Sequence, residues 1–297
     1  MRTPDARFAD LEGYPFAPHY LEVTASGTPP LRMHYLDEGP RDGIPVVLLH
    51  GEPTWSYLYR TMIGPLADAG HRVLAPDLFG FGRSDKPVED AVYSFDFHRS
   101  SLMRLIERLD LSNITLVCQD WGGILGLTLP MDMPGRFKRL LVMNTAIPTG
   151  EFVSEGFERW KAFAAVAPEI PVGGLVATDA LSAMNLMDAL AYDAPFPDNR
   201  YKAGVRRFPQ LVPVEPGMAG VEHGVRARQF WANEWTGESF MAIGLRDAVL
   251  GEAPMQALRG MIRNCPEPMK LPEAGHFVQE YGEAIAVSAL AHFGMSR

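Results

Sequence analysis

Short apolar runs alternate with amphipathic stretches along most of the chain. The runs are rich in Val, Leu and Ile and end in turn residues, which is typical of strands buried on both faces of a sheet. Five strands are predicted, over residues 44–49, 72–75, 114–118, 140–144 and 240–244. Helical spacing of apolar positions predicts helices over residues 95–109, 121–133, 255–263 and 278–293. This alternation predicts an α/β protein with a mostly parallel sheet covered by helices on both faces.

The alternation breaks between residues 148 and 225. Helical pieces over residues 157–166 and 178–190 lie among prolines there, and no strand pattern is evident. Long connections in compact folds are usually functional lids when they carry aromatic residues. We therefore predict a helical cap over residues 148–225, inserted into a core domain of residues 1–147 and 226–297. A decorative surface excursion is the alternative.

Composition fits a globular protein and narrows its partners. A chain of 297 residues that is 47% hydrophobic can bury a full core. The formal net charge is −9 with both signs interspersed, which disfavours nucleic acid and anionic membranes as partners. No segment approaches the roughly 18 uninterrupted apolar residues of a membrane helix, and the first residues lack the apolar region of a signal peptide. We therefore expect a cytoplasmic protein.

The residue types that bind metals show no suitable spacing. Cys118 and Cys265 match no zinc or redox pattern, so we interpret them as buried reduced thiols. The eight histidines include no pair spaced to share one helical face. Residues 80–84 lack the third glycine and the Gly-Lys ending of a phosphate-binding loop, and they are interpreted as a turn. The sequence predicts no metal site.

Polar residues follow several predicted strands, at the edge where open α/β sheets bind their ligands. Asp120 comes two residues after the strand over 114–118, and it is followed by Trp121 and two glycines. A tight strand-to-helix turn at this position would push the Asp120 side chain into the crevice, as in a nucleophile elbow. Taken alone, an aspartate before a helix is more often an ordinary N-cap.

Two later residues favour catalysis over capping. Asp247 follows the strand over 240–244, and His276 lies in a Gly-His turn before the last helix. The order nucleophile, acid, histidine along the chain is that of α/β-hydrolases. Asn144 is a second place where such a fold could hold its acid. Because an amide carries no charge, Asp247 is the better candidate.

A carboxylate nucleophile determines the type of reaction. Unlike a serine, Asp120 is ionised at neutral pH and needs no base before it attacks. It would displace a leaving group from an sp³ carbon and form an ester. His276, oriented by Asp247, would then activate a water molecule against that ester. Backbone N–H groups of Glu52 and Trp121 would stabilise the resulting oxyanion.

Two tryptophans indicate that the leaving group is a halide. It needs no proton but requires weak donors in a dry pocket, and an indole N–H on a large apolar body is such a donor. Trp121 lies next to the nucleophile, and Trp160 in the predicted cap is the candidate for a second donor. A tryptophan considered alone more often belongs to the core.

Several segments resemble haloalkane dehalogenases, and together they cover most of the chain. They are His-Gly-Glu-Pro-Thr-Trp at 50–55, Asp-Leu-Phe-Gly-Phe-Gly-Arg-Ser at 77–84, Val-Cys-Gln-Asp-Trp-Gly-Gly at 117–123, Ala-Pro-Phe-Pro-Asp at 194–198, Phe-Met-Ala-Ile-Gly at 240–244 and Ala-Gly-His-Phe-Val-Gln-Glu at 274–280. The similarity is closest to the subfamily with an Asp-His-Asp triad, which takes its acid after the later strand. This resemblance implies an α/β-hydrolase fold with an eight-stranded sheet and a helical cap after the sixth strand. It also implies no cofactor.

Carried over position by position, the resemblance implies a role for each candidate: Asp120 as nucleophile, His276 as base, Asp247 as acid, and Trp121 and Trp160 as halide donors. Phe157 in the cap would line the substrate pocket. The surrounding segment at 156–160 is more charged, at Glu158 and Arg159, than the lid helix it resembles. The implied partners are a small terminally halogenated alkane, its halide product and water, and we expect a monomer.

Two other functions use the same framework. Epoxide hydrolases share the aspartate and histidine but protonate an alkoxide, usually with lid tyrosines, and Tyr192 and Tyr201 lie in the predicted cap. Gln119 stands where epoxide hydrolases commonly have a histidine, which argues against them. A non-catalytic relative that binds a small molecule usually lacks a triad member, and none is missing here. A serine esterase is disfavoured because the elbow has no serine.

Overall fold

An eight-stranded sheet forms the centre of the computed structural model, which describes residues 1–24, 29–151, 154–180 and 183–296. The strand order is β1-β2-β4-β3-β5-β6-β7-β8, with β2 antiparallel to both neighbours and parallel pairing from β4 to β8. The strands are β1 His19–Val23, β2 Leu31–Glu38, β3 Pro45–Leu49, β4 Arg72–Pro76, β5 Ile114–Cys118, β6 Phe137–Met143, β7 Glu238–Gly244 and β8 Met269–Leu271. The predicted α/β-hydrolase architecture is confirmed.

The five predicted strands correspond to the central part of this sheet, from β3 and β4 to β7. Every residue of β5 is buried, because helices cover both faces of a central parallel strand. The apolar pattern does not predict β1, β2 or β8. β1 is an edge strand that is only partly buried, and β8 has three residues, so neither leaves the continuous apolar run that identifies the central strands.

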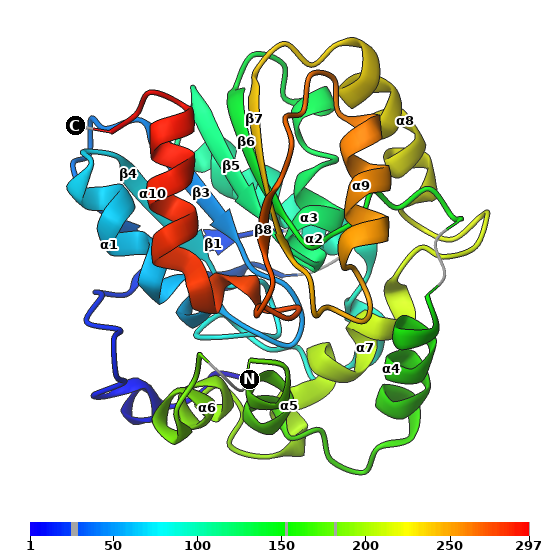
Figure 1. Ribbon diagram of the computed structural model, residues 1–297. Helices are drawn as coiled ribbons and strands as arrows, with labels where there is room; N and C mark the ends of the chain where they lie inside the picture. Colours follow the sequence, from blue (N-terminus) through cyan, green and yellow to red (C-terminus); the bar gives the residue numbers. More distant parts are fainter. Residues whose placement is uncertain (25–28, 152–153, 181–182, 297) are drawn as a thin grey trace.

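Helices form two layers on the sheet (Figure 1). α1 Arg60–Asp68 and α10 Gly282–His292 pack together on one side. On the other side lie α2 Phe95–Arg108, α3 Trp121–Gly126, α8 Val221–Asn233 and α9 Glu252–Met261. Short 3₁₀ helices are Asp5–Phe8, Ser56–Tyr59, Asp90–Val92, Pro130–Asp132, Asn199–Lys202 and Val278–Tyr281.

The helix predicted over residues 121–133 is wrong in its length. α3 ends at Gly126, and a separate 3₁₀ turn begins at Pro130. Proline has no N–H to continue an α-helix and disfavours helical backbone at the residue before it. The Thr128 hydroxyl also donates to the carbonyl of Leu125 at 2.6 Å, an oxygen near the end of the helix. The apolar pattern continues through this region because the turn is buried as well.

Of the α-helices that the described residues form between β6 and β7, all except α8 are grouped below the sheet in Figure 1. They are α4 Glu155–Val166, α5 Val172–Asp179, α6 Leu186–Asp193 and α7 Ala203–Leu211. The piece predicted over 157–166 agrees with α4. The piece predicted over 178–190 is wrong as one helix, because α5 ends at Asp179 and α6 begins after Asn185, whose side chain caps it; residues 181–182 lie outside the described residues.

The boundary predicted between cap and core, at residues 225 and 226, falls inside the continuous helix α8. Between the end of β6 and Glu238, where β7 begins, the described residues form helices and turns and no strand. None of the described helices is long and apolar enough to cross a membrane.

The segment over residues 77–84 is a buried turn that follows β4. The Asp77 carboxylate accepts hydrogen bonds from the N–H groups of Ser56 at 2.8 Å and Arg83 at 2.7 Å. It also contacts Nδ1 of His34 at 2.7 Å. Although burial alone would raise the pKa of Asp77, the His34 ring and these donors lower it below its usual range. Asp77 therefore fixes the loop after β3 to β2 and β4.

Candidate active site

Asp120 lies on a strained turn between β5 and α3. Its backbone has φ 49° and ψ −126°, a conformation that costs a non-glycine residue about 1–3 kcal/mol and persists mainly at functional sites. The N–H of Asp120 donates to the carbonyl of Asn144 at 3.0 Å, and the Thr145 hydroxyl donates to the Asp120 carbonyl at 2.7 Å. The carboxylate makes no capping hydrogen bond to α3. The ordinary N-cap interpretation is therefore excluded.

A close approach of backbone segments explains the glycines after Asp120. A Cβ at Gly122 would lie 1.9 Å from the carbonyl oxygen of Leu49, so a larger residue would force α3 away from β3. This packing brings the loop after β3 against the turn. The N–H of Glu52 in that loop donates to Oδ1 of Asp120 at 2.8 Å.

The two oxygens of Asp120 have different surroundings. Oδ1 is held by the Glu52 N–H, whereas Oδ2 lies 3.6 Å from Nε2 of His276. Trp121 is the first residue of α3, and its N–H has no acceptor within the helix. The helix N-terminus also presents partial positive charge to the carboxylate. Oδ2 is thus the oxygen positioned to react, and Oδ1 is the oxygen positioned to hold negative charge.

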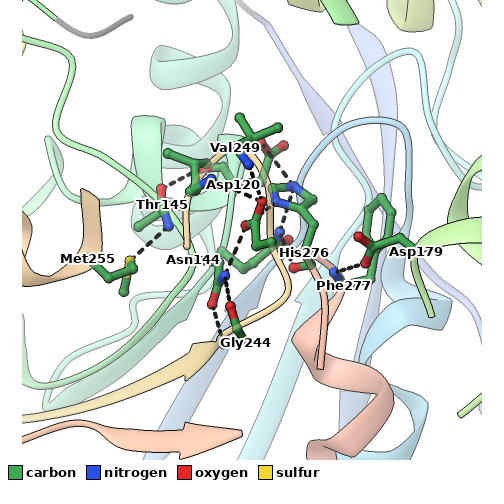
Figure 2. A network of polar contacts seen from close by, with 12 residues as sticks. Asp120, Asn144, Thr145, Asp179, Gly244, Val249, Met255, His276 and Phe277 are labelled. Carbon is green, nitrogen blue, oxygen red and sulfur yellow. Dashed lines mark hydrogen bonds and ion pairs between the residues drawn. The ribbon is translucent and has the colours of Figure 1, made fainter. Parts of the chain in front are cut away.

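His276 is paired with Asp247 at the ends of β8 and β7. Nδ1 of His276 lies 2.7 Å from Oδ2 of Asp247, and this carboxylate also accepts from the Asn144 side chain at 2.9 Å. Its other oxygen accepts from the N–H groups of Val249 and Leu250 at 2.7 and 3.0 Å. Figure 2 shows Asp120, Asn144 and His276 converging in one polar network. The acid predicted after β7 is therefore brought to the histidine, with Asn144 as its support.

Charge pairing shifts the pKa values of both partners. Burial raises the pKa of Asp247, but the His276 ring and the hydrogen bonds to the carboxylate together lower it to about 2. Burial lowers the pKa of His276, but Asp247 and Asp120 together raise it well above its ordinary value. Asp247 is therefore fixed as a carboxylate that accepts from Nδ1–H and directs Nε2 toward Asp120.

Gln119 contacts the histidine in a way that the sequence did not reveal. Its Nε2 lies 3.0 Å from Nε2 of His276 and donates to the His276 carbonyl oxygen, also at 3.0 Å. The Gln279 side chain supports Gln119 at 3.3 Å. The position next to Asp120 is the signal that could have identified Gln119.

A cavity of about 220 Å³ lies next to Asp120 and is lined partly by residues of α4, α5 and α7. It brings together the predicted residues Asp120, Trp121, Phe157, Trp160 and His276. Its walls also contain apolar residues that the sequence did not single out, among them Leu175, Pro209, Val212, Leu250 and Phe277. The cavity fits a small, mostly apolar molecule.

The lid tyrosines lie elsewhere. Neither Tyr192 nor Tyr201 is among the described residues that line the cavity. Tyr192 is buried and donates to the Glu280 carboxylate instead. The proton donors that epoxide opening would require are thus not placed over Asp120.

Trp160 and Glu52 meet at the cavity wall. Both residues line the cavity, and Glu52 is buried. Burial and the nearby Asp120 charge raise the pKa of the Glu52 carboxyl well above its ordinary value, although Trp160 and His276 act in the opposite direction. Its buried Oε1 has no hydrogen-bond partner among the described residues. Glu158 and Arg159, the charges that set this segment apart, are exposed on the outer face of α4. They do not alter the wall of the cavity.

Comparisons with known proteins agree with this arrangement. A family model described as "alpha/beta hydrolase fold" matches residues 44–283. A haloalkane dehalogenase of Mycolicibacterium paratuberculosis is 48% identical over 284 residues, covering 94% of this chain and 93% of that protein. One from Psychrobacter cryohalolentis is 45% identical over 290 residues, with coverages of 96% and 95%. The tetrameric structure of haloalkane dehalogenase DpaA from Paraglaciecola agarilytica is 61% identical, covers 99% of both chains and superposes with a TM-score of 0.96.

Proposed function

Because the chain belongs to the haloalkane dehalogenases of the α/β-hydrolase fold, we propose that Asp120 is its nucleophile and that His276, oriented by Asp247, is its base. One observation carries this assignment. Oδ2 of Asp120 faces Nε2 of His276 at 3.6 Å, at the floor of a small apolar cavity. The reaction converts a haloalkane and water into an alcohol, a halide and a proton.

In the first step, Oδ2 of Asp120 attacks the carbon that carries the halogen. The new carbon–oxygen bond forms an alkyl ester, and the halide leaves with the electron pair of the broken carbon–halogen bond. The indole N–H groups of Trp121 and Trp160 stabilise the departing anion. Burial raises the pKa of Glu52 well above its ordinary value, which disfavours a negative charge close to the departing halide.

In the second step, His276 removes a proton from water while the water oxygen attacks the ester carbonyl carbon. The carbonyl oxygen is Oδ1, and the N–H groups of Glu52 and Trp121 stabilise the negative charge that develops on it. Collapse of this intermediate breaks the bond between that carbon and the alkoxy oxygen. The alkoxide takes the remaining hydrogen of the attacking water and leaves as the alcohol, which restores the Asp120 carboxylate. The proton then passes from His276 to solvent.

Halide release tests the proposed activity. We expect small terminally chlorinated or brominated alkanes to yield one equivalent each of halide and acid per molecule consumed. A matched panel of epoxides should give no diol, because the described cavity wall contains neither Tyr192 nor Tyr201. Epoxide opening without halide release would replace the proposal by an epoxide hydrolase. Binding without turnover of either panel would indicate a non-catalytic relative.

The pKa of His276 is expected to fall when Asp120 loses its charge. The charged groups facing the ring are Asp120 and Asp247, and both raise its pKa, while burial lowers it. Glu52 is the third acid at the site, and burial together with the Asp120 charge raises its pKa, which disfavours its ionised form. An ester at Asp120 removes one of the two charges, so the imidazole becomes neutral, as a base must be, at a lower pH in the ester than in the free enzyme.

NMR titration of His276 in the wild type and in Asp120→Asn checks this expectation, because asparagine is neutral like the ester. We expect a lower pKa in the variant. The acid limb of ester hydrolysis in single-turnover experiments should follow the variant value rather than the wild-type value. Identical titration curves would contradict the charge coupling.

Trp160→Phe is expected to weaken halide binding. A hydrogen bond to a charged group contributes about 1.5–3 kcal/mol, so its loss should reduce affinity roughly tenfold or more. Halide inhibition of turnover measures this effect independently of tryptophan fluorescence. Trp235→Phe is the matched control, because its indole donates to Ser239 at 3.0 Å and Trp235 is not among the described residues lining the cavity. Equal inhibition constants in the wild type and Trp160→Phe would assign the second donor to another residue.

Exposed apolar side chains on α6 bear on the assembly of this chain. The sequence predicts a monomer, whereas DpaA is tetrameric. Three apolar side chains on α6, Leu186, Met187 and Leu190, are 73%, 54% and 53% exposed. This apolar face favours association of the chain with copies of itself. Light scattering should therefore give a multiple of 32.8 kDa, and a mass of 32.8 kDa would establish the monomer.

A further inference from the structure

A carboxylate from the cap reaches the turn that carries His276. Asp179 is the last residue of α5, and its Oδ2 accepts a 3.0 Å hydrogen bond from the N–H of Phe277. Figure 2 shows the Asp179 side chain pointing at Phe277, beside His276. This contact joins the segment between β6 and β7 to the core at the residue that follows the proposed base.

The residue before His276 also lies against the same carboxylate. A Cβ at Gly275 would come within 2.4 Å of Oδ2 and 2.5 Å of Oδ1 of Asp179, distances that real Cβ atoms do not show. The three nearest atoms that such a Cβ would meet all belong to Asp179. The turn therefore contacts Asp179 on both sides of His276, and a glycine allows that approach.

The position of Asp179 is unfavourable for α5 itself. The C-terminus of a helix carries partial negative charge, so a carboxylate there typically destabilises the helix by about 0.3–1 kcal/mol. The nearby helix α6 is tied to the core differently, through Asp188, which accepts from Tyr57 at 2.9 Å and from Arg60 at 3.0 Å. The acid at the end of α5 is thus better explained by the turn that it binds than by helix stability.

We propose that Asp179 is a positioning residue that fixes the catalytic histidine from the cap. By holding the N–H of Phe277 and packing against Gly275, it sets the turn from which the His276 ring reaches Asp120. The base is then in place only when α5 is seated against the core. This inference rests on the proposed role of His276 as the base of the second step.

Asp179→Ala should separate the two steps of the reaction. Asp120 needs no base, so ester formation should proceed at close to the wild-type rate. Ester hydrolysis should slow by about 10-fold to 100-fold, because small displacements of a catalytic group have effects of this size. Rapid quenching followed by mass spectrometry measures both rates and should show accumulated ester. Asp179→Asn retains an oxygen acceptor for the Phe277 N–H and should restore hydrolysis.

Asp188→Ala is the control for a structural effect. It removes the hydrogen bonds of Asp188 with Tyr57 and Arg60, which join cap and core without contacting the His276 turn. It should lower the thermal midpoint and leave the ratio of the two rates unchanged. If Asp179→Ala behaves like Asp188→Ala, the positioning role is overturned. The same follows if Asp179→Asn fails to restore hydrolysis.

Gly275→Ala provides a second test through non-additivity. A methyl group at this position must displace Asp179, so Gly275→Ala should slow hydrolysis much as Asp179→Ala does. In the Asp179→Ala background the methyl group has room, and Gly275→Ala should cause little further loss. Additive effects would show that the glycine and the aspartate act independently.

Failure of the positioning role of Asp179 can be distinguished from failure of the proposed function. If the wild type forms no ester on Asp120, or if His276→Ala does not slow ester hydrolysis, the proposed mechanism itself is wrong. If those experiments give the expected results while Asp179→Ala hydrolyses the ester at the wild-type rate, only the positioning role is wrong.

Discussion

Asp120→Asn is expected to abolish halide release, with a loss on the order of 10⁴-fold to 10⁶-fold, the range found when an enzyme loses its nucleophile. The amide has nearly the shape of the carboxylate but lacks the charge that attacks the carbon. Its oxygen can still accept from the Glu52 N–H, which holds Oδ1 at 2.8 Å in the wild type, so the turn should be retained. The loss should therefore appear in the chemistry rather than in folding.

Three measurements define this outcome. Halide production with a brominated alkane gives the rate, the thermal midpoint reports folding, and halide quenching of tryptophan fluorescence reports whether Trp121 and Trp160 still bind anions. Asp120→Ala serves as a second variant, because alanine cannot revert to aspartate by deamidation. Full residual activity in either variant would falsify the nucleophile assignment.

His276→Ala is expected to stop the reaction halfway. Asp120 should still attack and release one equivalent of halide, while hydrolysis of the ester slows by about 10² to 10⁴ because water has no base. The protein should gain the mass of one alkyl group, located on the peptide that contains Asp120. This pattern, a burst of halide followed by near arrest, distinguishes a base that acts in the second step from one needed throughout.

The alanine variant also leaves the buried Asp247 carboxylate without its main partner, and breaking a buried pair typically destabilises a protein by about 3–5 kcal/mol. His276→Gln keeps an amide N–H that can donate to Asp247, and it should trap the same ester in a more stable protein. His292→Ala, at an exposed position on α10, is the matched control and should turn over normally. Halide release without any covalent adduct in both His276 variants would contradict the two-step mechanism.

The sequence identified the candidate triad because each member lies next to an element that can be predicted locally. Asp120 and Asp247 come after strands with continuous apolar runs, and His276 comes before the last helix. In a parallel sheet the carboxyl ends of neighbouring strands meet at one edge, so residues distant along the chain could be expected at one site. Trp160 was a candidate from its place in the predicted cap, and the resemblance to the family supported it and added Phe157; both line the cavity.

Local patterns failed where tertiary context decides the backbone. The helix expected over 121–133 ends at Gly126, since apolar periodicity does not distinguish a buried helix from a buried turn. The helix expected over 178–190 is divided between α5 and α6. β8 is too short to leave a pattern, yet it carries the chain to His276.

The sequence alone determined the class of fold, the carboxylate at the elbow and the order of the candidate triad, because strand burial and turn chemistry depend on residues that are neighbours in the sequence. Only the tertiary structure decided how these groups are held. Gln119 contacts His276, which lies 157 residues later in the sequence, and Asp179 contacts Phe277, which lies 98 residues later. Trp160 and Glu52 line one cavity, and burial there raises the pKa of Glu52. Such contacts depend on packing between distant segments, and packing has no local signature in the chain.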